Sequence, residues 1–141
     1  MSVAFVFPGQ GSQAVGMLSS LLGRPEVDAL VARADAALGE PLLSRVIAEG
    51  PADELALTTW TQPAMLLAGI ANLAAWRAEG GPEPDFVAGH SLGEYTALVA
   101  AGSLDLDTTV KLVRLRAQTM QDRKSTRRTP VTYVSRMPSS A

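Results

Sequence analysis

Apolar positions along the chain fall into two kinds of run, short continuous ones and longer ones with helical spacing. Residues 3–7 (VAFVF) are apolar throughout and are followed by Pro8 and Gly9, which predicts a short, fully buried strand. Residues 8–13 (PGQGSQ) then form a glycine-rich turn. Residues 84–91 (PDFVAGHS) predict a second short strand.

Helical spacing covers most of the remaining chain before residue 122. One predicted helix opens at Pro25 and stops at Gly39. A longer one has Thr61 as its N-cap and Pro63 in its first turn, and its apolar middle predicts a buried helix. The predicted helices span residues 14–22, 25–38, 41–49, 61–80, 92–102 and 106–121. Strands alternating with helices predict an α/β fold, a parallel sheet flanked by helices.

The composition excludes several kinds of site. The 141 residues include no cysteine and one histidine, His90, so disulfides, thiolate zinc sites and histidine-rich metal sites are ruled out. No apolar stretch reaches the roughly 18 residues of a membrane span, and no signal peptide is visible, so we expect a cytoplasmic protein. Asp105 and Asp107 are typical of acids at a helix start. We predict no metal, no cofactor and no membrane contact.

Charge divides the chain at residue 122. The chain has 12 basic and 14 acidic residues; residues 123–141 hold five basic and no acidic ones, which leaves 7 basic and 14 acidic residues, a net charge of −7, in residues 1–122. This acidic part disfavours binding to nucleic acid. Residues 123–141 show no structural period, and we predict a basic tail that is disordered or is not native sequence, as after a change of reading frame.

Residues 89–93 (GHSLG) match the Gly-x-Ser-x-Gly pattern of a nucleophile elbow. In such an elbow the serine, here Ser91, occupies a strained turn between a strand and a helix, and glycine on either side relieves the crowding. The predicted strand and helix around Ser91 supply this context. The N–H group of Leu92 is placed to be one oxyanion donor. Ser91 is therefore the candidate nucleophile.

His90 is a poor candidate for the base that would activate Ser91. Adjacent side chains at a strand end point to opposite sides, so the imidazole is not expected to reach the serine hydroxyl. We expect His90 to be structural, or to hydrogen-bond to substrate or to a neighbouring loop. A catalytic base would have to come from another histidine, and the sequence has none.

Four segments occur together in the order and spacing of a known family. They are residues 5–13 (FVFPGQGSQ), 61–64 (TQPA), 89–102 (GHSLGEYTALVAAG) and 116–121 (RAQTMQ). In these segments the chain resembles the malonyl-CoA:acyl carrier protein transacylases of fatty acid synthesis and the related acyltransferase domains of polyketide synthases. The resemblance implies an α/β-hydrolase-like acyltransferase core, of which residues 1–122 would be the N-terminal part.

The resemblance also implies a ping-pong acyl transfer through Ser91. The serine would take a malonyl group from malonyl-CoA and pass it to the phosphopantetheine thiol of acyl carrier protein. The family pattern implies the N–H of Gln10 as second oxyanion donor, Arg116 as the partner of the malonate carboxylate, and Gln62 as a hydrogen-bonding residue of the site. From the residues alone, Arg116 would be a solvated charge like Arg114, and Gln62 a polar residue at a helix start.

The sequence departs from the family pattern in one important way. The family's catalytic histidine and its ferredoxin-like subdomain would lie beyond residue 122, and neither is visible. Because losing a triad member lowers turnover by several orders of magnitude, we expect the chain as written to be nearly inactive. Trp60 and Trp76 are expected to be packing residues.

Other functions stay open. An α/β serine hydrolase shares the Gly-x-Ser-x-Gly pattern, although the HGGG-type stretch usual in that class is absent. A non-catalytic acyltransferase fragment that binds coenzyme A, a carrier protein or a partner chain would fit the single histidine. An acyltransferase domain of a polyketide synthase is a third alternative. GHSLG together with Arg116 favours malonyl over larger acyl groups.

Overall fold

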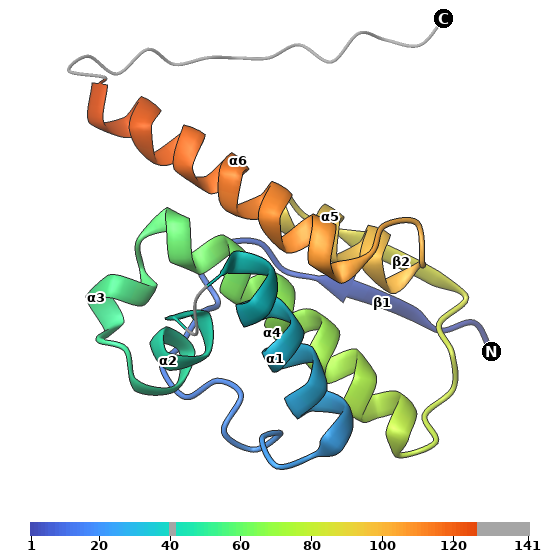
Figure 1. Cartoon of the computed structure of the whole chain (residues 1–141). Coiled ribbons are helices and arrows are strands. Elements are labelled where there is room, and N and C mark those ends of the chain that lie inside the picture. The colour runs from blue at the N-terminus through green and yellow to red at the C-terminus, as the bar shows by residue number, and fades with distance from the viewer. Residues whose placement is uncertain (40–41, 127–141) are drawn as a thin grey trace, which may run out of the picture.

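Two parallel strands pack against a layer of helices in the computed structural model, which describes residues 1–39 and 42–126 (Figure 1). Strand β1 (Ala4–Phe7) pairs in parallel with β2 (Phe86–Gly89). The helices are α1 (Pro25–Leu38), α2 (Leu42–Glu49), α3 (Ala52–Leu55), α4 (Thr58–Ala78), α5 (Leu92–Ala100) and α6 (Leu106–Thr126). The first four helices form the long connection that two parallel strands need. The predicted α/β class is confirmed.

Helix α4 is the centre of the core. It is buried around most of its circumference, and α1, α5 and α6 pack against it (Figure 1). Leu66 and Leu67 of α4 are fully buried, as are Val110 and Val113 on the facing side of α6. The buried helix predicted from its all-round apolar pattern is therefore present.

The start of α4 differs from the prediction. The helix begins at Thr58, with Leu57 in the cap position, so Thr61 lies inside the first turn and is not the N-cap. The Thr61 hydroxyl donates instead to the carbonyl oxygens of Leu55 and Leu57. A threonine hydroxyl can bond a carbonyl one turn back as readily as it can cap, and the residue type alone does not decide between them.

Three other local predictions need correction. The predicted helix over residues 14–22 is absent, and residues 15–23 form consecutive turns: the N–H groups of Met17, Ser19 and Leu21 bond carbonyls three residues back, and Gly16 and Gly23 both have positive φ. The four-residue helix α3 was not predicted, since it is too short to show a period. Helix α6 continues five residues past Gln121, to Thr126. The predicted basic tail therefore begins inside α6, and its remainder, from residue 127, lies outside the described residues.

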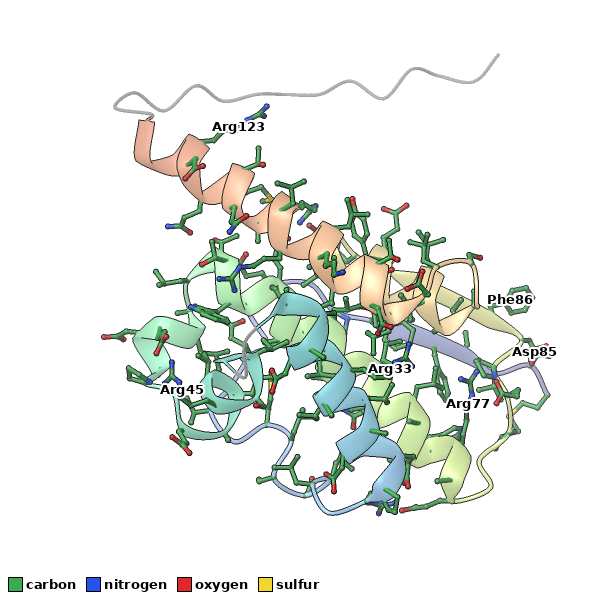
Figure 2. The ribbon with its side chains drawn as sticks, viewed as in Figure 1. Arg33, Arg45, Arg77, Asp85, Phe86 and Arg123 are labelled. Atoms are coloured by element: carbon green, nitrogen blue, oxygen red, sulfur yellow. The ribbon has the colours of Figure 1, made fainter. Side chains whose placement is uncertain are left out.

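The sheet has one covered and one open face. The pairing of Ala4 with Phe86 and of Val6 with Ala88 places these four residues on one face, and all four are exposed. Val6 is 72% and Phe86 66% exposed, and Figure 2 shows the Phe86 ring pointing away from the body of the molecule. The prediction of a fully buried β1 is wrong, because helices of the described chain cover only the opposite face.

The covered face of the sheet packs on α4. Phe7 is buried and lies beside Gly69 of α4, where an added Cβ would come within 3.2 Å of the Phe7 ring. Phe5 meets the ring of Trp76 edge-on, with 5.6 Å between ring centroids, and the Trp76 indole donates to the carbonyl of Pro82. Trp76 is therefore a packing residue, as predicted. Within the described residues, no helix combines the length and apolarity needed to cross a membrane.

Candidate active site

Ser91 lies in a strained turn between β2 and α5. Its backbone has φ 52° and ψ −113°, and it is the one residue other than glycine with positive φ in the described part of the chain. Such a conformation costs about 1–3 kcal/mol and persists where the surrounding structure enforces it. The side chain is exposed at the start of α5. The structure thus gives Ser91 the geometry that its sequence pattern predicts.

The flanking glycines are required by direct backbone contact. A Cβ on Gly89 would lie 1.9 Å from the carbonyl carbon of Gly93, and one on Gly93 would lie 2.0 Å from the carbonyl oxygen of Phe7. No side chain fits in either place. The end of β1, the end of β2 and the start of α5 therefore meet around Ser91 with backbone against backbone.

Two backbone N–H groups near Ser91 are available as donors. Within the turn, the N–H of Gly93 donates to His90 O at 2.8 Å and that of Glu94 to Ser91 O at 3.1 Å. The N–H groups of Leu92 and Gln10 donate to no acceptor within residues 1–39 and 42–126. Both are candidates for the oxyanion donors that we predict.

The 8–13 turn lies directly against the elbow. A Cβ on Gly9 would be 3.0 Å from His90 O and 3.6 Å from both Ser91 Cβ and His90 Cδ2. Glycine at this position therefore lets Gln10 approach the nucleophile. The Gln10 side chain donates a long bond, 3.4 Å, to the Thr58 hydroxyl at the start of α4.

Arg116 of α6 reaches Ser91, the candidate nucleophile. Its Nη2 donates to Ser91 Oγ at 3.3 Å, and its Nη1 donates to Gln62 Oε1 at 2.6 Å. The guanidinium is half-buried, and no carboxylate of the described residues pairs with it. It is therefore not the solvated charge that its position on an amphipathic helix suggests.

Gln62 is buried and bonds Arg116. Its side chain is 1% exposed, accepts from Arg116, and donates from Nε2 to the Met120 sulfur at 3.3 Å. With both ends of its amide bonded, Gln62 holds the guanidinium in place. Its role is thus more than that of a polar residue at a helix start, since it lies inside the first turns of α4.

Two contacts of the site were not found from sequence. The Arg116 guanidinium carbon lies 5.6 Å from the centroid of the Tyr95 ring, and Met120 bonds Gln62. Met120 lies four residues after Arg116 on α6, and Tyr95 lies four residues after Ser91, which precedes α5 in the cap position. Because residues four apart share a helix face, this spacing was the available signal.

His90 does not bond the nucleophile. Its imidazole is exposed and makes no hydrogen bond with any described residue, while its backbone N–H donates to Phe7 O at 3.1 Å. The close approach to Gly9 gives it contact with the neighbouring loop. The structure offers no support for His90 as the base, and its role toward substrate stays a prediction.

Asp105 caps a helix. Its Oδ1 accepts from the N–H of Thr108 at 2.8 Å, and this bond holds the pKa of the carboxyl below its ordinary value. Asp107 pairs instead with Arg33 of α1, at 3.1 Å. Among the described residues, no group of three or more acidic or histidine side chains is placed to hold a metal ion.

The surroundings of Arg114 differ from those that we expected. The sequence suggests a solvated charge, yet the side chain is half-buried, its guanidinium carbon lies 4.0 Å from the centroid of the Trp60 ring, and its Nη1 donates to Thr59 O at 3.0 Å. Trp60 is a buried packing residue, as predicted, and its ring also makes the cation–π contact with Arg114.

The chain is similar to a set of longer acyltransferases. It is 50% identical over 120 residues to the malonyl CoA-acyl carrier protein transacylase of Escherichia coli strain K12, an alignment covering 84% of this chain and 38% of that protein. A crystal structure of an acyl-carrier-protein S-malonyltransferase from Burkholderia pseudomallei superposes with a TM-score of 0.82 at 55% identity, covering 86% of this chain and 39% of the other.

A second similar structure contains a partner. It is a malonyl-transacylase in complex with a type II polyketide synthase acyl-carrier protein, with a TM-score of 0.81 and 46% identity, covering 86% of this chain and 40% of that one. The chain thus spans about two fifths of the length of these relatives. The sequence profile of the acyl transferase domain matches residues 4–131. With most of the chain matched, and with a serine elbow and arginine at the site, this protein belongs to the acyl transferase domain family.

Proposed function

We propose that the chain is the nucleophile-bearing part of a malonyl-CoA:acyl carrier protein transacylase of fatty acid synthesis, a cytoplasmic enzyme. The observation that carries the proposal is the 3.3 Å contact between Arg116 Nη2 and Ser91 Oγ. An acyl group on Oγ that ends in a carboxylate would bring that carboxylate beside the guanidinium. A planar guanidinium binds a carboxylate with two parallel hydrogen bonds.

The proposed reaction has two acyl transfers. Ser91 Oγ attacks the thioester carbonyl of malonyl-CoA, the C–S bond breaks, and coenzyme A leaves as the thiol with the proton lost by the serine. The phosphopantetheine thiol of acyl carrier protein then attacks the ester, the C–O bond breaks, and Ser91 regains its proton. Neither step calls for a metal or cofactor, and the N–H groups of Gln10 and Leu92 would stabilise the oxyanion in both.

Selectivity follows from the charge on Arg116. The guanidinium is half-buried and forms no ion pair with the described residues, so binding an acyl chain without a carboxylate leaves it uncompensated. A site built around such a charge rejects the uncharged analogue strongly. We therefore propose malonyl-CoA as substrate in preference to acetyl-CoA.

Turnover of the 141-residue chain is proposed to be low. The sequence holds a single histidine, and His90 makes no hydrogen bond with Ser91. Without a base the serine has ordinary reactivity, and turnover is expected to lie several orders of magnitude below that of an intact triad enzyme.

The test combines binding with mass spectrometry of the intact protein. The chain should bind malonyl-CoA more tightly than acetyl-CoA, Arg116→Ala should remove the difference, and any malonyl adduct should disappear in Ser91→Ala. Equal affinity for the two thioesters in the unaltered chain would contradict the proposal. Binding of malonyl-CoA with no adduct at all would instead favour a non-catalytic binding protein.

A serine hydrolase is another alternative, and the substrate distinguishes it. An ester that lacks a carboxylate should be cleaved by a hydrolase and left intact by a malonyl transacylase. The half-buried Arg116 at the nucleophile favours the transacylase.

A further inference from the structure

Two arginines of α6 dock on the same turn of α4. Arg114 contacts Thr59 and Trp60, and Arg116 contacts Gln62. Because a helix turns by about 100° per residue, side chains two positions apart leave it in directions roughly 200° apart. The two arginines therefore flank the line of contact between α4 and α6, one on each side.

The Arg114 contact is specific in geometry. The guanidinium carbon lies 4.0 Å from the centroid of the Trp60 indole, and Nη1 donates to Thr59 O at 3.0 Å. Trp60 is only 9% exposed, so its ring is a fixed platform. A cation over an indole face is attracted by the ring's quadrupole, more strongly when partly shielded from water.

The contacts of Arg114 add direction to an apolar interface. Val110, Val113 and Ala117 of α6 are fully buried and hold that helix against the core. A cavity of about 160 Å³ beside them is lined by Leu38, Trp60, Arg114 and Gln118. Because apolar contacts are non-directional, the cation–ring contact and hydrogen bond of Arg114 restrict the rotation of α6 in a way that apolar burial alone does not.

The same rotation decides whether Arg116 reaches the nucleophile. If α6 turned about its axis, the guanidinium of Arg116 would leave both Gln62 Oε1, at 2.6 Å, and Ser91 Oγ, at 3.3 Å. The same turn would pull Arg114 off the Trp60 ring. Both contacts therefore require the same rotation of α6 about its axis.

We propose that Arg114 is a positioning residue of the active site: its docking on Trp60 and Thr59, together with the buried apolar face of α6, fixes the rotation of α6 at which Arg116 faces Ser91. Arg114 touches neither the nucleophile nor the acyl group and acts through Arg116. Its consequence for selectivity rests on the function proposed above, whereas its consequence for the Arg116 side chain does not.

The matched control is another contact that joins α6 to a neighbouring helix. Arg33 of α1 lies near the start of α6 (Figure 2) and pairs with Asp107 at 3.1 Å. Asp107 is nine residues before Arg116 on α6. Both arginines join α6 to a neighbouring helix, and only Arg114 lies one turn or less from Arg116. If Arg114 served stability alone, removing it and removing Arg33 would have the same kind of effect.

The experiment compares Arg114→Met with Arg33→Met in the full 141-residue chain. The first readout is the side-chain Nε–Hε resonance of Arg116 by NMR, assigned with Arg116→Lys. The second is the ratio of the dissociation constants for acetyl-CoA and malonyl-CoA. We expect Arg114→Met to move the Arg116 resonance toward that of a free arginine and to reduce the ratio at least fivefold, and Arg33→Met to change neither. Arg114→Lys, which keeps the charge but not the planar group, should restore part of the ratio.

The possible outcomes are distinct. If Arg114→Met lowers the melting temperature but leaves the Arg116 resonance in place, Arg114 is only structural and the proposal fails. If Arg114→Met does not fold, the resonance in Arg114→Lys decides in the same way. If the unaltered chain does not distinguish malonyl-CoA from acetyl-CoA, the proposed function fails, while the resonance still tests the positioning.

Discussion

Helix α4 and strand β1 are both apolar segments, and the structure treats them differently. Helix α4 is enclosed by α1, α5 and α6, whereas the sheet is covered on one face and leaves Val6 72% and Phe86 66% exposed on the other (Figures 1 and 2). A continuous apolar run is suited to a strand with both faces covered. Within the described residues, the apolar sequence of α4 is thus matched by burial, whereas the apolar sequence of β1 is matched by burial on only one face.

The largest effect should come where the sheet meets α5. In Gly93→Ala the new Cβ would lie 2.0 Å from the carbonyl oxygen of Phe7, so β1 and the elbow must separate. We expect a loss of about 4 kcal/mol or more in the free energy of unfolding, measured by urea denaturation. Gly102→Ala, with φ 74° and no atom within 4 Å, is the control and should cost about 1–2 kcal/mol. Similar losses in the two variants would show that the elbow has room to relax.

The second largest effect should come from shortening a side chain in the core around α4. Leu66 of α4 is fully buried, and Leu66→Ala should lower the free energy of unfolding by about 2–5 kcal/mol, because it removes buried apolar volume and leaves a cavity. Chemical denaturation measures the change, provided that the free energy of unfolding depends on denaturant concentration with the same slope in both proteins. A loss below about 1 kcal/mol would mean that the core around α4 is looser than the structure indicates.

The open face of the sheet should respond much less. Phe86→Ser and Val6→Thr change side chains that are already in water, so each should alter the free energy of unfolding by no more than about 0.5 kcal/mol. Both should reduce binding of a dye that reports exposed apolar surface. Phe7→Ala on the covered face is the matched comparison and should cost about 3–5 kcal/mol. If Phe86→Ser destabilised the chain as much as Phe7→Ala, this face would be buried in solution.

The smallest effect concerns the cap of α6 and depends on pH. The bond from Thr108 N–H lowers the pKa of Asp105 in the folded chain, so the carboxylate stabilises the fold above its unfolded pKa and loses this effect as pH falls through its folded pKa. Asp105→Ala should therefore melt slightly below the unaltered chain at neutral pH, and the difference should shrink in acid. Asp105→Asn, which can still cap, is the control. A difference in melting temperature between Asp105→Ala and the unaltered chain that stays the same from neutral to acid pH would contradict this assignment.

Local chemistry made much of the candidate site predictable. The glycines at 89 and 93 around Ser91 predicted a strained turn, and the backbone contacts of both glycines show why no other residue fits. The buried helix α4 followed from its apolar pattern, and the end of α1 from Gly39, which adopts the left-handed conformation. In each case the cause lies within a few residues of the position concerned.

Contacts between distant segments could not be predicted in this way. Arg114 and Arg116 have the same residue type and the same helix, and nothing in their local sequence says that one lies on Trp60 and the other beside Ser91. The resemblance to a known family identified Arg116 but gave no role to Arg114. The position of Thr61 inside α4, instead of at its cap, was likewise decided by where the preceding chain folds.

The sequence by itself determined the order of strands and helices, the elbow at Ser91 and the family, because these depend on short-range sterics and on the spacing of residue types. Only the tertiary structure decided which face of the sheet is open and which side chains surround the nucleophile. Burial and hydrogen bonding between segments 25 or more residues apart, such as Arg116 with Gln62 and with Ser91, depend on how the helices pack. That packing depends on apolar area that several segments bury together, and no local pattern encodes it.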